Sequence, residues 1–186
     1  QMAEQFQFQN LFTEVEARWR LVETAWSLNM PKHSLTVEYS DELKLLFTNG
    51  RFGKRTAITG CRDALNGYQK GSCFYCYGDI SIQSEGMDRA EVDHFLPHVL
   101  KTQGFGSTID SVWNLVLACR GCNAGENGKF AKVPKLDYLK RLHKRNEFFI
   151  RSHHPLRETI ILQTGKSEEK RKHFLQDKYN QACKLL

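Results

Sequence analysis

The N-terminal part of the chain carries apolar residues at alternating steps of four and three, with charged residues between them. These apolar residues are Phe8, Phe12, Val15, Trp19, Val22 and Trp26. The spacing follows the period of an α-helix and predicts an amphipathic helix that ends before Pro31. We expect this apolar stripe to pack on the chain's own core, although its near-heptad spacing also suits a helical partner or a second copy of the chain.

The chain then alternates between short apolar runs and turn-forming residues. Ser40 and Asp41 stand before the run ELKLLF and predict a second, capped helix. GYQKGS at residues 67–72 predicts a loop that leads into the first pair of cysteines.

Two short apolar runs follow, and each has the length of a strand. Residues 90–96 predict a strand that Pro97 stops, and VWNLVLA at residues 112–118 predicts a second one. Residues 101–110 contain two glycines and predict a flexible connection between the strands. A short helix is expected to begin at the second pair of cysteines.

The C-terminal third is helical in pattern. Pro134 precedes a helix with the sequence KLDYLKRLHKRNEFF, SHHPLRETI at residues 152–160 predicts a structured loop, and Ser167 begins a last helix toward Leu186. The chain is therefore expected to be α+β and mainly helical. We divide it into an N-terminal helical extension at residues 1–70, a core at residues 71–132 and a basic C-terminal helical extension at residues 133–186.

Composition narrows the class of protein. The 186 residues are 40% hydrophobic and 26% charged, which is typical of a globular protein rather than a disordered or fibrous one. No run approaches the roughly 20 apolar residues that span a bilayer, so no membrane association is expected. No basic patch followed by an apolar segment indicates a secretory signal, and a cytoplasmic location is the expectation.

The net charge of +6 favours a polyanionic partner such as DNA. Basic residues gather between residues 129 and 151, directly after the cysteine-rich region. They are Lys129, Lys132, Lys135, Lys140, Arg141, Lys144, Arg145 and Arg151.

Four of the six cysteines form two C-x-x-C pairs, CFYC with Cys73 and Cys76 and CRGC with Cys119 and Cys122. Each pair offers two thiolates at the spacing used by tetrahedral zinc, so the two pairs predict a structural Zn²⁺ site. Disulfides fit poorly with a cytoplasmic protein, and a redox dithiol does not need a second copy. The remaining Cys61 and Cys183 are expected to be buried as small apolar residues.

Four polar residues lie in or beside the predicted strands and the short helix. They are Asp93, His94, Asn114 and Asn123. Two strands and a helix held at their base by four cysteines would turn these side chains toward one another. Asn127 stands one turn after Asn123 and shares its helix face.

The succession of C-x-x-C, VDHFLP and WNLVLACRGCN resembles the HNH nuclease motif, in its HNN form, of the ββα-metal or His-Me finger superfamily. The resemblance covers the chain from Cys73 to about Lys129. It implies a ββα-metal core stapled by the zinc site and a metal-dependent DNA endonuclease activity. The products would carry a 5′-phosphate and a 3′-hydroxyl.

The resemblance also implies a role for each polar residue. Asp93 and Asn123 would hold one catalytic Mg²⁺ or Mn²⁺, His94 would activate water, and Asn114 would brace the loop that orients His94. Side-chain chemistry independently supports these roles. Imidazole titrates near neutrality and suits a general base, while carboxylate and amide oxygens are hard ligands that suit Mg²⁺ or Mn²⁺.

The chain departs from the motif after the second cysteine pair. Many members carry a lysine where this chain has Glu126, and the next basic residue is Lys129. Glu126 could approach the metal, but an exposed position is favoured for an acid on a short helix. Asn127 matches a further metal ligand of some relatives, while a helix C-cap beside Gly128 is the favoured alternative.

Other candidate residues have weaker support. His98 lies beyond Pro97 and is expected in a loop or at the surface rather than on a metal, and His153 and His154 lack the neighbours of a second metal centre. The expected nucleic-acid contacts are Arg120, Lys129 and Lys132.

Two further functions stay open at this point. The chain could be a non-catalytic zinc module that binds nucleic acid or protein, or it could cleave RNA. The C-terminal stretches also resemble those of HNH proteins associated with bacterial restriction and phage defence.

Overall fold

The computed structural model describes residues 11–12, 14–16, 18–23, 37–49, 55–83, 86–126 and 128–186. The predicted positions Phe8, Trp26 and Asn127 lie outside these residues. The described residues between 11 and 23 are helical, which agrees with the predicted N-terminal helix.

The apolar stripe of this helix faces away from the core. Phe12, Val15 and Trp19 are exposed over 69%, 56% and 52% of their surface, so the expected packing of the stripe is wrong for these three residues. The helix instead docks through the face that carries Leu21, which is buried, and Glu14, whose carboxylate lies close to Gly67. The alternative, a helical partner or second copy on the stripe, stays a prediction.

Residues 37–49 and 55–60 contribute to an antiparallel sheet, so the second predicted helix is wrong. The strands β1 (Val37–Ser40), β2 (Leu45–Asn49) and β3 (Arg55–Gly60) pair in that order. Residues 41–44 are a turn in which Lys44 has a φ of 53° and its ammonium lies 2.6 Å from the Asp41 carboxylate. A short apolar run such as ELKLLF fits a buried strand as well as a helix, and the turn decides between them.

A second, two-stranded sheet follows the helix α2 (Cys61–Gln69). β4 (Glu91–His94) pairs antiparallel with β5 (Leu115–Ala118), with Asp93 opposite Val116 and His94 opposite Leu115. Both predicted strands are confirmed, although each is shorter than expected. The second begins later because residues 112–114 form the 3-10 turn η4 (Val112–Asn114).

The connection between these strands is structured, so the expected flexible connection is wrong. It contains the 3-10 helices η2 (His98–Gln103) and η3 (Gly106–Asp110). Leu100, Phe105 and Ile109 are buried and anchor the connection to the core. Gly104, with a φ of 102°, supplies the turn between the two helices.

The two helices predicted after Pro134 and from Ser167 are confirmed, whereas residues 157–160 of the predicted structured loop are helical. The chain continues through α3 (Arg120–Asn123), α4 (Leu136–Arg151), α5 (Arg157–Thr164) and α6 (Glu168–Leu185). The Ser167 hydroxyl caps α6 by accepting from the Lys170 N–H at 3.3 Å. Cys61 is buried as expected, but Cys183 is exposed on α6, so that part of the prediction is wrong.

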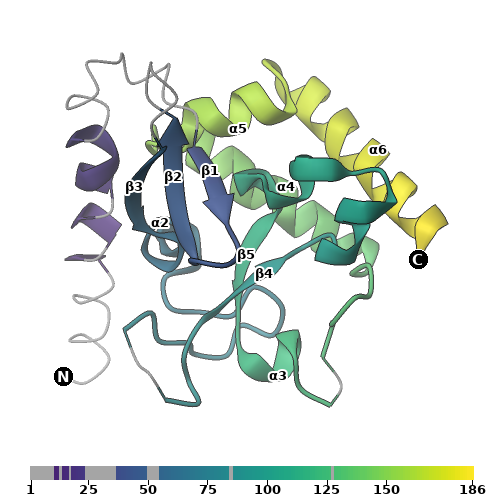
Figure 1. Cartoon of the computed structure of the whole chain (residues 1–186), viewed down its shortest axis with the longest axis horizontal. Coiled ribbons are helices and arrows are strands. Elements are labelled where there is room, and N and C mark those ends of the chain that lie inside the picture. The colour runs from purple at the N-terminus through teal and green to yellow at the C-terminus, as the bar shows by residue number, and fades with distance from the viewer. Residues whose placement is uncertain are drawn as a thin grey trace.

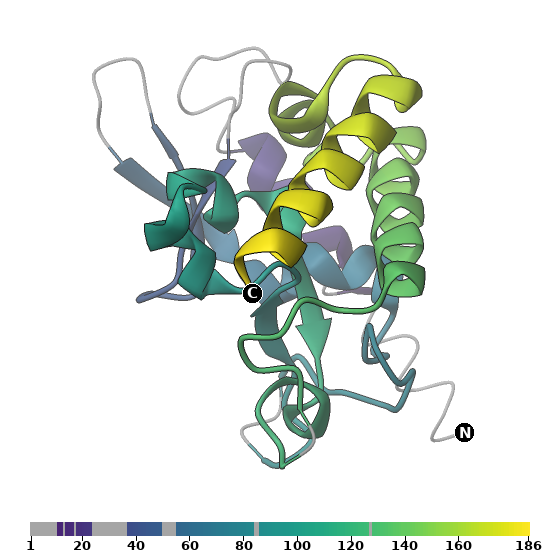
Figure 2. The same cartoon turned by 90° about the vertical axis from the view of Figure 1, so that its right-hand side faces the viewer.

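Figure 1 shows the arrangement of these elements. The N-terminal helix and the three-stranded sheet lie on one side, α4, α5 and α6 lie on the other, and the β4–β5 hairpin runs between them toward α3. In Figure 2, α4 and α6 lie side by side. No helix in the described part of the chain is both long and apolar enough to cross a membrane.

Arg145 of α4 holds the start of β5 in place. It is buried and donates to the carbonyl oxygens of Trp113 at 3.0 Å and Leu115 at 2.6 Å. Arg145 is therefore a structural member of the basic stretch and is removed from any DNA-binding surface.

Candidate functional site

Four cysteine sulfurs converge at the base of the β4–β5 hairpin. The Sγ atoms of Cys73, Cys76, Cys119 and Cys122 lie within 4.8 Å of one another, and those of Cys76 and Cys119 are 3.8 Å apart. Sulfurs on one tetrahedral zinc with Zn–S bonds of about 2.3 Å stand about 3.8 Å apart. The cluster therefore fits structural Zn²⁺.

Backbone groups support and anchor the cysteine cluster. The N–H groups of Gly78 and Cys119 donate to the sulfurs of Cys76 and Cys73 at 3.4 and 3.3 Å. The Gln69 side chain, at the end of α2, accepts from the Leu117 N–H at 2.8 Å and donates to the Leu117 carbonyl at 2.7 Å. Because Leu117 lies in β5, these bonds join α2, the first cysteine pair and the hairpin into one unit.

One face of β4 carries oxygen ligands and meets α3. Asn123 of α3 donates its amide N–H to the Glu91 carboxylate at 2.8 Å. Asp93, two residues further along the strand and on the same face, accepts from the Tyr75 hydroxyl at 2.5 Å and lies 3.2 Å from the Lys129 ammonium. Burial raises the pKa of the Asp93 carboxyl, and Lys129 opposes this shift.

The donor set on this face is compatible with a hard divalent cation. Glu91, Asp93 and Asn123 bring two carboxylates and an amide to the junction of β4 with α3. These oxygen ligands suit Mg²⁺ or Mn²⁺ better than softer metals. In this structure Lys129 supplies the positive charge beside Asp93. If a cation bound there, the Lys129 ammonium would have to move away from the carboxylate or contact it together with the cation. Glu126 is exposed, as the sequence favoured.

His94 points to the opposite face of β4. Its Nε2 lies 3.0 Å from Oδ1 of Asp110, and the Tyr39 ring of β1 packs edge-on at 5.8 Å. The residue is only 6% exposed. Burial lowers the pKa of His94 to about 4 against the opposing effect of Asp110, so the ring is neutral at pH 7.

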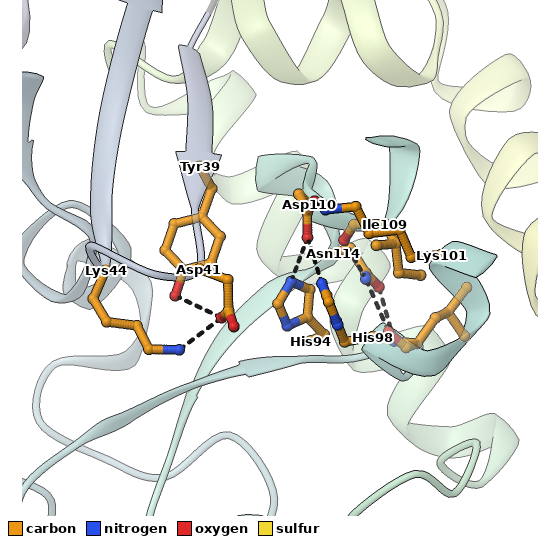
Figure 3. Close-up of polar contacts among 10 residues, drawn as sticks. Tyr39, Asp41, Lys44, His94, His98, Lys101, Ile109, Asp110 and Asn114 are labelled. Carbon is orange, nitrogen blue, oxygen red and sulfur yellow. Dashed lines mark hydrogen bonds and ion pairs between the residues drawn. The ribbon is translucent and has the colours of Figure 1, made fainter. Parts of the chain in front are cut away.

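His98 and Asp110 gather around His94, a feature that the sequence did not predict. His98 Nε2 lies 3.5 Å from Asp110 Oδ1, its ring centroid is 5.0 Å from that of His94, and Lys101 Nζ is 2.6 Å from Asp110 Oδ2. Figure 3 shows both imidazoles turned toward the same carboxylate. His98 is exposed, as expected, but η2 and η3 fold back over the end of β4 and bring its ring beside that of His94.

Asn114 ties the segment after His94 to the start of β5. Its side chain accepts from the Leu96 N–H at 2.8 Å and donates to the carbonyl oxygens of Leu96 at 3.0 Å and Ile109 at 2.8 Å. Leu96 lies two residues after His94, and Ile109 lies directly before Asp110. Asn114 therefore fixes the spacing between the end of β4 and η3.

The four predicted polar residues are thus not turned toward one another, and that expectation is wrong. Asp93 and Asn123 belong to the face that meets α3, whereas His94 contacts Asp110 on the other face. Adjacent residues of a strand point to opposite faces, and this separates Asp93 from His94.

The three residues expected to contact nucleic acid differ from one another in their exposure. Arg120 and Lys132 are exposed near α3, whereas Lys129 is buried against Asp93. Arg141 donates to the carbonyl oxygen of Tyr75 at 3.0 Å and stacks on the Tyr77 ring at 4.1 Å, which commits it to the first cysteine pair.

Comparison of the chain with known protein families, curated proteins and solved structures finds no match in any of the three. What the chain does must therefore be inferred from its own side chains.

Proposed function

We propose that the chain is an HNH-type, metal-dependent nuclease that hydrolyses phosphodiester bonds in DNA. One observation carries this proposal. The hairpin β4–β5 leads directly into α3, four cysteines close its base, and Asp93 and Asn123 stand where the strand meets the helix. This arrangement follows the order of the sequence motif that resembles the HNH family.

Asp93 and Asn123 would hold Mg²⁺ or Mn²⁺, with Glu91 beside them. Such a cation supplies positive charge for the attacked phosphate and the departing 3′ oxygen. The protein's own part is to hold the ligands in register, and the Tyr75 hydroxyl does so for Asp93. Arg120 and Lys132 would contact backbone phosphates, which position a protein on DNA without reading its sequence.

His94 would accept the proton of the attacking water. With Nε2–H donating to Asp110, the other ring nitrogen, Nδ1, is unprotonated and is the atom that receives this proton. The Asp110 carboxylate then stabilises the imidazolium that forms. Asn114 keeps the loop that carries Asp110 at a fixed distance from β4.

A second candidate function has its own support. Asp93 and His94 are both buried and hydrogen-bonded, and Lys129 already neutralises Asp93. Such pairing also suits a non-catalytic zinc module that binds nucleic acid or protein.

Nicking of supercoiled plasmid separates the two functions. Wild-type protein should nick DNA with Mg²⁺ or Mn²⁺ and not with EDTA, and His94→Ala should be slower by about 100-fold or more, because general bases contribute that much. His173→Ala, at an exposed histidine of α6, is the matched control and should cleave like wild type.

Equal cleavage by wild type and His94→Ala, or no cleavage by any of the proteins across several metals, would rule out the catalytic proposal. Labelled RNA in parallel reactions decides the class of substrate. Faster cleavage of RNA than of DNA would replace DNA in the proposal.

A further inference from the structure

His94, His98 and Asp110 bring three metal-binding atoms together from three successive elements. His94 ends β4, His98 begins η2 and Asp110 ends η3. One ligand atom from each lies within 4.8 Å of the other two. Figure 3 shows the two imidazoles and the carboxylate converging on one point. This cluster is separate from the four cysteines and lies on the opposite face of β4 from Asp93.

The measured separations are close to those around a bound ion. A metal with ligand bonds of about 2.1 Å keeps its ligand atoms about 3.0 to 3.4 Å apart, depending on its geometry. His94 Nε2 and His98 Nε2 lie 3.0 and 3.5 Å from Asp110 Oδ1. These two distances lie within a few tenths of an ångström of that range, and the ligand atoms of the two histidines lie no more than 4.8 Å apart.

The donor types select the class of metal. Two imidazoles and one carboxylate suit Zn²⁺ and other first-row transition metals, whereas Mg²⁺ prefers oxygen ligands alone. The second oxygen of Asp110 is held by Lys101 at 2.6 Å, which orients the first oxygen toward the histidines. Because Lys101 is partly exposed, its ammonium can turn to solvent when a cation arrives.

The cluster is also open on one side. The side chains of His94 and Asp110 are 7% and 14% exposed, but that of His98 is 47% exposed. A cavity of about 370 Å³, lined in part by Tyr39, Asp110 and Ser111, adjoins the carboxylate. Three protein ligands with one open side leave room for an ion to enter and to keep a water ligand.

We infer that His94, His98 and Asp110 form a second metal site that binds Zn²⁺ or a similar transition-metal ion. If the nuclease function proposed above holds, occupancy of this site inhibits cleavage. A ring nitrogen of His94 bound to the ion fixes the imidazole and removes it from proton transfer. The site would then be inhibitory, whereas the hard-oxygen face of β4 supports the reaction.

Metal stoichiometry tests the site without reference to cleavage. The full chain is dialysed against Zn²⁺, and bound zinc is measured by mass spectrometry. Wild type and His173→Ala should bind two equivalents, whereas His98→Ala and Asp110→Asn should keep only the equivalent of the four cysteines. That retained equivalent also reports that the variants are folded.

Co²⁺ added to protein whose cysteine site already holds Zn²⁺ gives a second readout. Wild type should develop visible bands without the intense near-ultraviolet absorption of cobalt thiolates, and His98→Ala should not. Lys101→Met should tighten Co²⁺ binding several-fold, because it removes a positive charge beside the ion.

Binding of one equivalent only by wild type, or unchanged binding of two by His98→Ala and Asp110→Asn, would overturn the proposed site. Inhibition is tested separately, by titrating Zn²⁺ into nicking reactions that contain Mg²⁺. Each protein is compared with its own zinc-free rate, and His98→Ala should need at least tenfold more Zn²⁺ for half-inhibition than wild type. Equal sensitivity of the two proteins to Zn²⁺ would overturn the inhibitory role. If wild type does not nick DNA at all, the nuclease proposal fails, and the zinc stoichiometry still tests the metal site.

Discussion

The Asp93 carboxylate is buried, and two groups offset the cost of removing it from water. The Tyr75 hydroxyl donates to one oxygen and the Lys129 ammonium lies 3.2 Å from the other. Removing either partner of such a buried ion pair destabilises the folded state, because the remaining charge stays buried without a counter-charge. Under the nuclease proposal, a divalent cation would replace Lys129 beside this carboxylate, because both supply positive charge.

Asp93→Asn tests this exchange. The substitution keeps the shape of the side chain and an acceptor for Tyr75 but removes the charge that holds a cation. We expect metal-dependent cleavage to fall by about 100-fold or more while DNA affinity stays within about threefold, since the phosphate contacts lie elsewhere. Nicking rates and fluorescence anisotropy with labelled duplex measure the two quantities. A parallel loss of affinity would show that Asp93 acts in binding instead.

His154 is a buried histidine outside the candidate site. Its Nδ1 accepts from the Leu156 N–H at 3.1 Å and its ring packs 4.6 Å from that of Phe149. Burial lowers the pKa of His154 to about 3, with Arg18 and Arg145 acting in the same direction. The folded protein therefore keeps this ring neutral.

Acid should destabilise the protein through His154. An unfolded histidine has a pKa of about 6.5, so the unfolded state binds the proton first as pH falls. The contribution of His154 to the free energy of unfolding is complete above that pH. It is lost at up to about 1.4 kcal/mol per pH unit as pH falls toward the folded value. His154→Asn keeps an acceptor for the Leu156 N–H. Its free energy of unfolding, measured with urea between pH 7 and pH 5, should fall less steeply with pH than that of wild type. Equal slopes would contradict the assignment.

Among the elements, the β4–β5 hairpin and α3 meet at the four-cysteine cluster. α3 has only four residues, begins directly after Cys119 and contains Cys122, so a metal held by these cysteines would fix its position. Structural zinc sites contribute binding free energy directly to folding.

Cys119→Ser should therefore lose one equivalent of tightly bound zinc. The melting temperature should fall by about 10 °C or more, because each 1 kcal/mol shifts it by about 2–4 °C in a chain of this length. Cys183→Ser changes an exposed cysteine of α6 and serves as the matched control. Metal content and thermal unfolding check the result, and equal zinc in the two variants would contradict it.

Sequence patterns predict the elements that have strong local signals. The two cysteine pairs, the strands around Asp93 and Leu115, and α4 and α6 all follow from spacing, proline and capping residues. The prediction for ELKLLF was wrong because six residues are too few to distinguish the period of a helix from that of a strand. The turn at residues 41–44 was therefore not evident.

The candidate site was predictable only in part. The motif identified Asp93, His94, Asn114 and Asn123, but His98 and Asp110 lie 12 residues apart in a stretch whose glycines suggested a flexible connection. Their meeting depends on the burial of Leu100, Phe105 and Ile109, which is a tertiary effect.

In the whole molecule, α3 and the helices α5 and α6 lie far apart. α3 lies at the end of the β4–β5 hairpin, while α5 and the first turns of α6 lie at the opposite end (Figures 1 and 2). The exposed Arg120 belongs to the first of these ends. The net charge of +6 favours a polyanionic partner, and under the nuclease proposal the exposed groups near α3 would determine where DNA binds.

Arg120→Ala should weaken DNA binding and reduce its dependence on salt. Loss of one phosphate contact lowers the slope of log affinity against log salt concentration by about 0.9. Lys172→Ala removes an equal charge from the first turns of α6 and should leave this slope unchanged. Anisotropy titrations at several salt concentrations measure the slope, and equal effects of the two variants would mean that DNA does not bind at the α3 end.

In the proposed nuclease, the metal ligands lie on the face of β4 that meets α3, and the general base, His94, lies on the other face. The most direct test is the single-turnover cleavage rate of His94→Ala as a function of Mg²⁺ concentration. We expect the maximal rate of His94→Ala to be lower than that of wild type by about 100-fold or more. The half-saturating Mg²⁺ concentration should be unchanged, because His94 does not hold this ion in the proposed mechanism. An unchanged maximal rate, or a half-saturating concentration raised in step with the loss of activity, would contradict it.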